Sequence, residues 1–164
     1  MNLQQELGLD RPFQDVCHET VLNIVRTANL IASVGADLFR RFDLTEAQFN
    51  VLLALKYRDR ELTQSDLGKR LVVTRASITS VLDKLEAKEL VLRRNVAGNR
   101  RIHIVTLTPK GEELLEGVEP VYTETVHKAL DHLHDDECRT LISLLERVRE
   151  HLRTMMPATQ SGRP

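Results

Sequence analysis

Arginine, lysine and small hydroxyl side chains are the residues of this chain best suited to binding chemistry, and they concentrate between Thr63 and Lys110. This segment holds ten Lys and Arg residues against four Asp and Glu, although the formal net charge of the whole chain is −1. Guanidinium and ammonium groups neutralise phosphates, and hydroxyl groups add hydrogen bonds to phosphates and base edges. The segment therefore predicts a nucleic-acid-binding surface in an otherwise acidic chain, with an ordinary solvated charged face as the alternative.

The sequence does not indicate enzymatic chemistry. It contains no GxSxG nucleophile motif, no GxxxxGKS or GxxxxGKT phosphate loop and no GxGxxG dinucleotide motif. No pair of carboxylates carried on strands is placed for acid–base work. We therefore expect a protein that is not an enzyme and that needs no cofactor.

Two sensing mechanisms remain open as alternatives. Metal sensing would use His127, Asp131, His132 and His134, but only His127 and Asp131 have helical i, i+4 spacing, and no CxxC or HExxH motif accompanies them. Redox sensing would use Cys17, whose acidic neighbours disfavour a reactive thiol. The chain has two cysteines far apart in sequence, which do not predict a disulfide framework.

Helical periodicity predicts the elements that precede the basic segment. Apolar residues at near-helical spacing over 15–42, without an internal proline, predict one long helix. Thr45 and Gln48 have the spacing of a capping box, in which each residue's side chain accepts a hydrogen bond from the other's backbone amide. A second helix is therefore expected from this box to Lys56.

Two short helices with a tight connection are predicted at the start of the basic segment. Thr63 and Asp66 repeat the capping signal and open the first, which the β-branched pair Val72-Val73 ends. Thr74 caps the second, whose polar residues face outward. Its inward stripe consists of Ile78, Val81, Leu82 and Leu85. This arrangement predicts a helix-turn-helix with an exposed recognition helix.

After Lys88 the periodicity changes from helical to strand-like. Segments 90–94 and 102–107 are rich in large and β-branched apolar residues, and turn-forming residues separate them. They predict a β-hairpin whose tip, residues 97–101, presents Arg100 and Arg101 to a minor groove or to phosphates.

Two more helices are expected toward the C-terminus. Thr108 and Pro109 predict the N-cap and first position of a helix of about 20 residues, with a kink at Pro120. Asp135 or Asp136 is expected to cap the last helix, which carries more apolar surface than a small monomer usually hides. The same helix of a second subunit is the simplest cover for that surface.

Composition and termini indicate a folded, cytoplasmic protein. Hydrophobic residues make up 41% of the chain and charged residues 29%, which is typical of folded rather than disordered chains. The first residues lack the basic and apolar regions of a signal peptide, and no apolar run approaches about 18 residues, so no membrane association is expected. The polar tail over 157–164 is expected to be disordered.

The basic segment resembles the MarR family of bacterial transcription regulators. The resemblance rests on three fragments in order, QSDLGKRLVVTRASITSVLDKL (64–85), GNRR (98–101) and LTPKG (107–111). The family usually has Asp-x-Arg in its wing. This chain has Asn99 at the acidic position, so a neutral hydrogen bond would replace any charged one to Arg101.

The resemblance implies a mainly α fold with a small β-hairpin wing, in which a winged helix-turn-helix is joined to N- and C-terminal dimerisation helices. The DNA-binding domain would span 43–108, and the helical dimerisation region 1–42 and 109–156. A homodimer, a pseudo-palindromic double-stranded DNA operator, repression and release by a small-molecule effector are implied with it. The alternative is a winged-helix module used only for protein–protein contact.

Residue by residue, the resemblance also implies a set of DNA contacts. Arg75 of the recognition helix is the candidate for a guanine, with pairing to Asp83 or contact with a phosphate only as the alternatives. Arg101 would enter a minor groove. The other residues of the expected DNA-binding set would hold phosphates or lie near base edges. The expected DNA-binding residues are Thr63, Gln64, Thr74, Arg75, Ser77, Thr79, Ser80, Lys84, Arg93, Arg94, Asn99, Arg100 and Arg101. No residue is assigned to an effector pocket.

Overall fold

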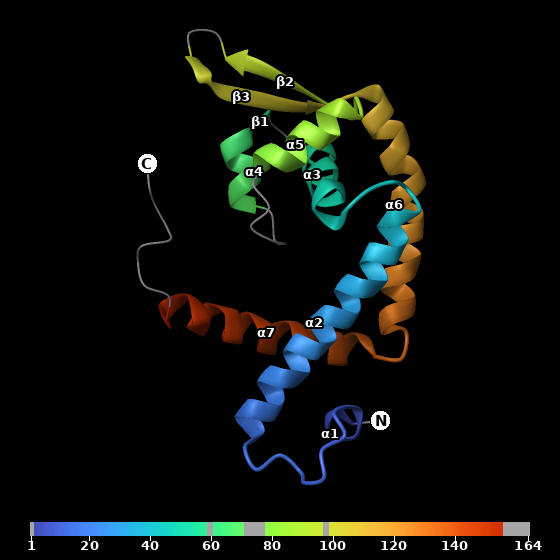
Figure 1. The fold of residues 1–164 in the computed structure, drawn as a ribbon, viewed down its shortest axis with the longest axis vertical. Coiled ribbons are helices and arrows are strands. Elements are labelled where there is room, and N and C mark those ends of the chain that lie inside the picture. The colour runs from blue at the N-terminus through green and yellow to red at the C-terminus, as the bar shows by residue number, and fades with distance from the viewer. Residues whose placement is uncertain (1, 59–60, 71–77, 97–98, 156–164) are drawn as a thin grey trace. The chain divides into compact units, whose positions relative to one another are not determined.

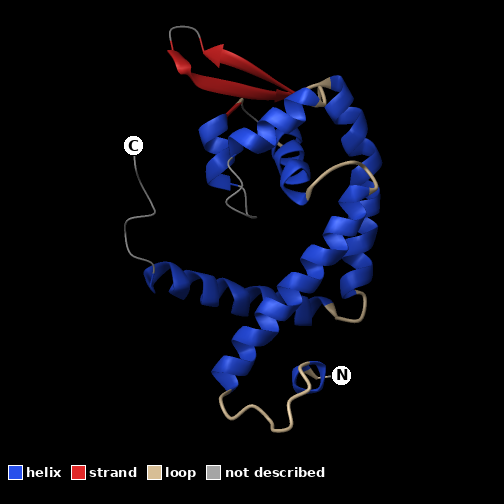
Figure 2. Ribbon diagram, in the orientation of Figure 1, coloured by secondary structure: helices blue, strands red, loops and turns tan. Residues whose placement is uncertain are grey.

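The computed structural model describes residues 2–58, 61–70, 78–96 and 99–155, with the side chains of 70, 96 and 99–101 outside the described part. Within these ranges the chain is mainly helical with one small antiparallel sheet, which confirms the predicted fold class (Figure 1, Figure 2). Contacts divide the chain into a first unit, residues 1–122, which includes the sheet, and a second unit, 123–164. None of the described helices is long and apolar enough to cross a membrane.

A short helix and a long helix begin the first unit. The periodicity does not predict α1 (Leu3–Glu6), which a capping box between Asn2 and Gln5 opens. α2 (Val16–Arg40) begins where expected, because the Asp15 carboxylate accepts a hydrogen bond at 2.8 Å from the backbone amide two residues further on.

α2 ends at Arg40, two residues before the predicted end. Asp43 adopts a left-handed conformation with a φ of 53°, and the Leu44 amide donates back to the Phe39 carbonyl at 3.0 Å. This pattern is a Schellman cap, which closes the helix although Phe42 continues its apolar period.

The predicted capping box of α3 (Glu46–Lys56) is confirmed. The Gln48 amide donates to the Thr45 hydroxyl at 3.2 Å, and the Thr45 amide donates to the Gln48 side-chain oxygen at 2.9 Å. Gln48 is buried by this reciprocal pairing, which satisfies backbone donors that the helix itself leaves free.

An aromatic cluster anchors α3 to α2 and to α6 (Pro109–Leu130). Phe49 is fully buried, and its ring centroid lies 4.7 Å from that of Phe39 and 4.9 Å from that of Tyr122. Phe39 is also buried, whereas Tyr122 is partly exposed, and the ring contacts add apolar stabilisation at this junction.

Two short helices follow, α4 (Gln64–Arg70) and α5 (Ile78–Ala87). The capping signal at Thr63 is confirmed, because its hydroxyl accepts from the Asp66 amide and the Asp66 carboxylate accepts from the Thr63 amide, both at 3.1 Å. The apolar stripe of α5 faces inward as predicted, with Val81, Leu82 and Leu85 buried and Ile78 half-buried. The predicted connection, with its cap at Thr74, lies outside the described residues.

The strands β1 (Leu62–Thr63), β2 (Val91–Val96) and β3 (Asn99–Leu107) form an antiparallel sheet in the order β1-β3-β2. Figure 1 shows this sheet beside α4 and α5. The sequence does not predict β1, because a strand of two residues has no periodicity. Pairing of Leu62 with Val105 defines it.

The hairpin is longer than the sequence predicts. The ladder between β2 and β3 continues to the pair Val96 and Asn99, past a register shift between Asn95 and Val96. The expected tip over 97–101 is therefore wrong in part, since the backbone of residues 99–101 belongs to β3. Cross-strand hydrogen bonds, rather than local apolar content, decide where such a ladder ends.

α6 begins as predicted, because the Gly111 amide donates to the hydroxyl of the capping residue Thr108 at 3.1 Å. The helix continues through Pro120. A Cβ at Gly111 would overlap the carbonyl oxygen of Leu90 and press on Leu107. α6 and the start of β2 therefore meet almost backbone to backbone, where only glycine fits.

The second unit contains α7 (Asp135–Met155), which begins differently from the prediction. The His134 amide donates to the Glu137 carboxylate at 2.8 Å, so His134 is the capping residue. The prediction of a cap at Asp135 or Asp136 is wrong by one or two residues, because both lie in the first turn, where their charges favour the helix dipole. No residue of α7 is buried within the chain. The tail 157–164 lies outside the described residues.

Candidate nucleic-acid interface

The outer face of α5 carries three of the residues expected to contact DNA. Thr79, Ser80 and Lys84 are exposed, whereas Val81 and Leu82 between them are buried. This division follows from the helical period, since burial of the apolar stripe turns the intervening polar residues outward. The predicted orientation of these three side chains toward solvent is what a major-groove contact requires.

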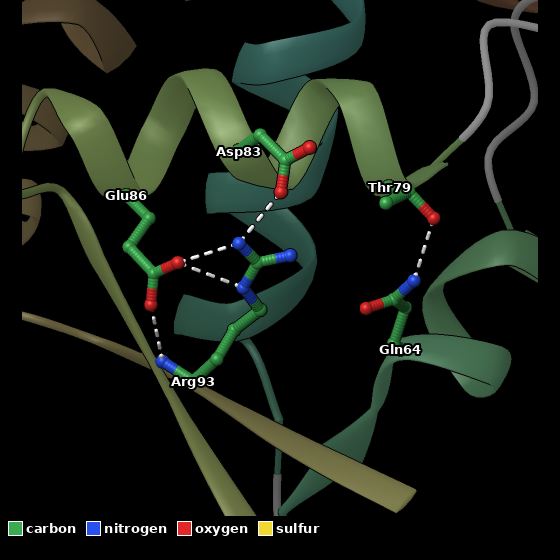
Figure 3. A network of polar contacts seen from close by, with 5 residues as sticks. All are labelled: Gln64, Thr79, Asp83, Glu86 and Arg93. Carbon is green, nitrogen blue, oxygen red and sulfur yellow. Dashed lines mark hydrogen bonds and ion pairs between the residues drawn. The ribbon is translucent and has the colours of Figure 1, made fainter. Parts of the chain in front are cut away.

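Two expected contact residues from different helices lie together. The side-chain amide of Gln64, the first residue of α4, donates to the Thr79 hydroxyl of α5 at 2.8 Å (Figure 3). A groove of about 640 Å³ lies beside this pair, lined by residues of α4, α5 and β3 that include Lys69 and His103. The first unit thus has a recess beside the start of α5, lined by both polar and apolar side chains.

The adjacent arginines of β2 have opposite surroundings. A strand period of two places consecutive side chains on opposite faces of the sheet. Arg93 pairs across the ladder with the buried Val105, and Arg94 pairs with Ile104. The side chain of Arg93 is 21% exposed and that of Arg94 is 54% exposed. The two arginines therefore cannot share one role.

Arg93 binds two carboxylates of α5 (Figure 3). Its Nε donates to Oε2 of Glu86 at 2.9 Å, and its Nη2 donates to Oε2 of Glu86 at 2.5 Å and to Oδ1 of Asp83 at 2.6 Å. Its backbone amide donates to Oε1 of Glu86 at 3.2 Å. The hydrogen bonds that Arg93 donates to Glu86 lower the pKa of Glu86 and raise the pKa of Arg93, so both groups stay charged.

Arg94 remains accessible to a phosphate. Its Nη2 lies 2.8 Å from the Glu61 carboxylate, and the side chains of both residues are more than half exposed. Surface ion pairs of this kind are weak and screened by salt, so a phosphate can readily replace Glu61.

The remaining expected DNA-binding residues are only partly described. Thr63 is half-buried and caps α4. Thr74, Arg75 and Ser77 lie outside the described residues. Asn99, Arg100 and Arg101 contribute backbone to β3, but their side chains are outside the described part.

Four residues near this surface are absent from the sequence-based set. Asp83 and Glu86 are the partners of Arg93, and Lys69 and His103 line the groove. Strand alternation is a signal that could have separated the two arginines, since Arg93 falls on the same side of β2 as the buried Val91. No local signal connects Glu86 with a strand residue seven positions later.

The residues considered for sensing are on the surface. Cys17 is exposed, and so are His127, Asp131, His132 and His134. Among the described residues, no three His, Cys, Asp or Glu side chains are grouped as a metal site.

Comparisons with known proteins agree on one family. The sequence pattern of the MarR family matches residues 42–102. An HTH-type transcriptional regulator of Bacillus cereus is 30% identical over 131 residues, which cover 79% of this chain and 86% of the relative.

Solved structures support the same relationship. A MarR transcription factor from Planctomyces limnophilus is 30% identical, with a TM-score of 0.64 over 82% of this chain and 98% of that one. BpsR of Bordetella bronchiseptica, in a study of how 6-hydroxynicotinic acid regulates its DNA binding, is 26% identical, with a TM-score of 0.66 over 79% and 98% of the two chains. This chain therefore belongs to the MarR family of helix-turn-helix transcriptional regulators.

Proposed function

We propose that this protein is a repressor that binds a pseudo-palindromic DNA operator as a homodimer and is released by a small-molecule effector. The observation that carries the proposal is the exposed row of Thr79, Ser80 and Lys84 on α5, with the accessible Arg94 on the neighbouring strand. A helix with such a face fits the major groove. The ligand-regulated DNA binding of BpsR, a similar protein, supports both the DNA and the effector.

In this proposal α5 reads the major groove. Thr79 and Ser80 would lie near base edges. Arg75 and Ser77, which come just before them in the sequence, would contact the same groove. Gln64 approaches the same groove through its hydrogen bond to Thr79. Hydroxyl groups accept and donate, so they tolerate several bases, and Arg75 supplies the strongest preference as a bidentate partner of guanine.

The DNA backbone and the minor groove are held by basic residues around this helix. Lys84 and Arg94 are exposed and would neutralise phosphates. Arg100 and Arg101 of the wing would reach the minor groove, where narrow A·T tracts concentrate negative potential. Asn99 would orient Arg101 by a neutral hydrogen bond.

Dimerisation is supported by exposed apolar surface in the helices outside the DNA-binding domain (43–108). α7 has no buried residue, yet it exposes Leu141, Ile142, Leu144, Val148 and Leu152 by 41–55% each. Surfaces of this kind mark association sites, and a two-fold dimer matches a palindromic operator. We assign dimerisation to the regions 1–42 and 109–156.

Fluorescence anisotropy tests the proposal, using the duplex from upstream of the gene and a scrambled duplex over a range of salt concentrations. We expect tight binding to the native duplex, with log affinity falling linearly with log salt. Lys84→Gln and Arg94→Gln should each reduce that slope by about one, because each removes one phosphate contact. Lys128→Gln removes an exposed lysine of α6 that pairs with Glu124, and as the matched control it should leave the slope unchanged.

Equal, weak binding to both duplexes would contradict binding at the protein's own promoter. Selection from a random-sequence DNA library would then test for any other operator. If no duplex is preferred, and the protein instead binds another protein without salt dependence, the winged helix is a protein-interaction module.

A further inference from the structure

One polar edge of α5 is tied to the elements on both sides of it in the sequence. Thr79, Asp83 and Glu86 follow one another along this edge at spacings of four and three residues, and Figure 3 shows them in a row. Thr79 holds Gln64 of α4, while Asp83 and Glu86 hold Arg93 of β2. The helix proposed to read DNA is therefore joined to the preceding helix and to the wing strand.

We propose that Arg93 is a positioning residue, which fixes α5 against the wing strand β2 and makes no phosphate contact of its own. This inference rests on the proposed DNA-binding function. It gives Arg93 a different role from the phosphate contact that the sequence suggests, and it makes Asp83 and Glu86 part of the DNA-binding machinery although neither can attract DNA.

Charge and burial argue against a phosphate contact at Arg93. Its guanidinium faces two carboxylates, and its side chain is only 21% exposed. A phosphate would have to displace charge-assisted hydrogen bonds at 2.5–2.9 Å. It would then lie beside the unpaired carboxylates of Glu86 and Asp83, which would repel it. Arg94, with one exposed partner, has neither obstacle.

The geometry of the contact between Arg93 and the two carboxylates can hold α5 in place against β2. The Glu86 carboxylate accepts from both the guanidinium and the backbone amide of Arg93, so it holds the strand itself as well as the side chain. A planar guanidinium that bridges Glu86 and Asp83 also resists rotation of α5 about its axis. Base readout requires helix placement to within about half an ångström, which is the precision that such a bridge protects.

The direction in which one substitution changes the DNA affinity separates a positioning role of Arg93 from a phosphate contact. Glu86→Gln removes a negative charge from the DNA-binding lobe, so electrostatics alone predicts tighter DNA binding. The positioning role predicts about ten-fold weaker binding, because a neutral amide holds the guanidinium poorly, with an unchanged salt slope. Glu89→Gln is the matched control. It removes a charge from the same lobe, in an exposed pair with Lys110, and should not weaken binding.

Two further variants test Arg93 directly. Arg93→Lys keeps the charge that a phosphate contact needs but cannot bridge two carboxylates, so we expect it to bind as weakly as Glu86→Gln. The double variant Glu86→Gln with Arg93→Gln should bind no more weakly than the weaker single variant, because both changes break one tie. Circular dichroism and thermal unfolding establish that each variant is folded.

The experiment uses the dimeric full chain and a duplex that the wild-type protein selects from a random library. The NMR signal of the Arg93 Nε–H should keep its position when DNA binds. Three results would each overturn the positioning role of Arg93 and leave the proposed function intact. They are tighter DNA binding by Glu86→Gln, full DNA affinity of Arg93→Lys, and a shift of the Nε–H signal when DNA binds. Failure of the wild-type protein to select any duplex would instead overturn the proposed function.

Discussion

The ammonium group of Lys56, at the end of α3, lies 2.9 and 3.0 Å from the two carboxylate oxygens of Glu119 on α6. The Tyr57 hydroxyl donates to the same carboxylate at 2.8 Å. The side chains of Lys56 and Glu119 are 28% and 20% exposed. The hydrogen bonds to Glu119 raise the pKa of both Lys56 and Tyr57. This cluster joins α3 to α6 within the first unit.

We expect the stabilisation from this cluster to disappear at alkaline pH. Because the folded-state pKa values of Lys56 and Tyr57 are raised, their contribution is complete below the ordinary values and is lost as the pH rises through the raised ones. Urea unfolding at pH values of about 8 and about 11 should show a larger loss for the wild-type protein than for Glu119→Gln. The exposed Glu113→Gln should behave as wild type, and an equal loss in all three proteins would contradict the prediction.

Two glycines of α6 should respond in opposite directions to the same substitution. Gly111→Ala places a Cβ against the Leu90 carbonyl oxygen and should destabilise the fold by about 2 kcal/mol. Gly117→Ala meets no atom within 4 Å and should stabilise it by up to about 1 kcal/mol, because alanine favours a helix. Thermal unfolding measures both, and a stabilising effect of Gly111→Ala would refute the close approach.

Glu89 occupies a position that favours glycine. Its φ is 62°, and the Leu90 amide donates back to the Leu85 carbonyl at 3.0 Å, which is a Schellman cap at the end of α5. Glu89→Gly should raise Tm by roughly 2–4 °C, because it relieves the left-handed conformation. Glu89→Ala removes the same exposed pair with Lys110 but keeps the strain, so it should not raise Tm. A rise with alanine would point to the charge instead.

The apolar face of α7 should be required for dimerisation. Leu144 and Val148 are 49% and 41% exposed within one chain, and a charge at either position would be buried in the proposed interface. Leu144→Glu and Val148→Glu should therefore yield monomers in size-exclusion chromatography with light scattering. Arg153→Glu introduces the same residue at an exposed polar position of α7 and should remain dimeric. A dimeric Leu144→Glu protein would place the interface elsewhere.

Much of the helical framework could be predicted because its signals are local. The capping box of Thr45 and Gln48, and the cap at Thr108, use partners within three residues, so residue types and spacing suffice to locate them. The outward position of Thr79, Ser80 and Lys84 follows from the helical period in the same way. These features place most of the described contact surface of α5 without any tertiary information.

By itself, then, the sequence determined the order of the helices from α2 to α7, the caps at Thr45, Thr63 and Thr108 and the exposed face of α5, because these depend on neighbours one turn away. Only the tertiary structure decided the presence of β1, the length of the hairpin and the partners of Arg93, since each depends on pairing between distant segments. Strand alternation alone places Arg93 and Arg94 on opposite faces of β2. The carboxylates that α5 brings to one of these faces pair with Arg93, which is half-buried, and Arg94 on the other face remains exposed.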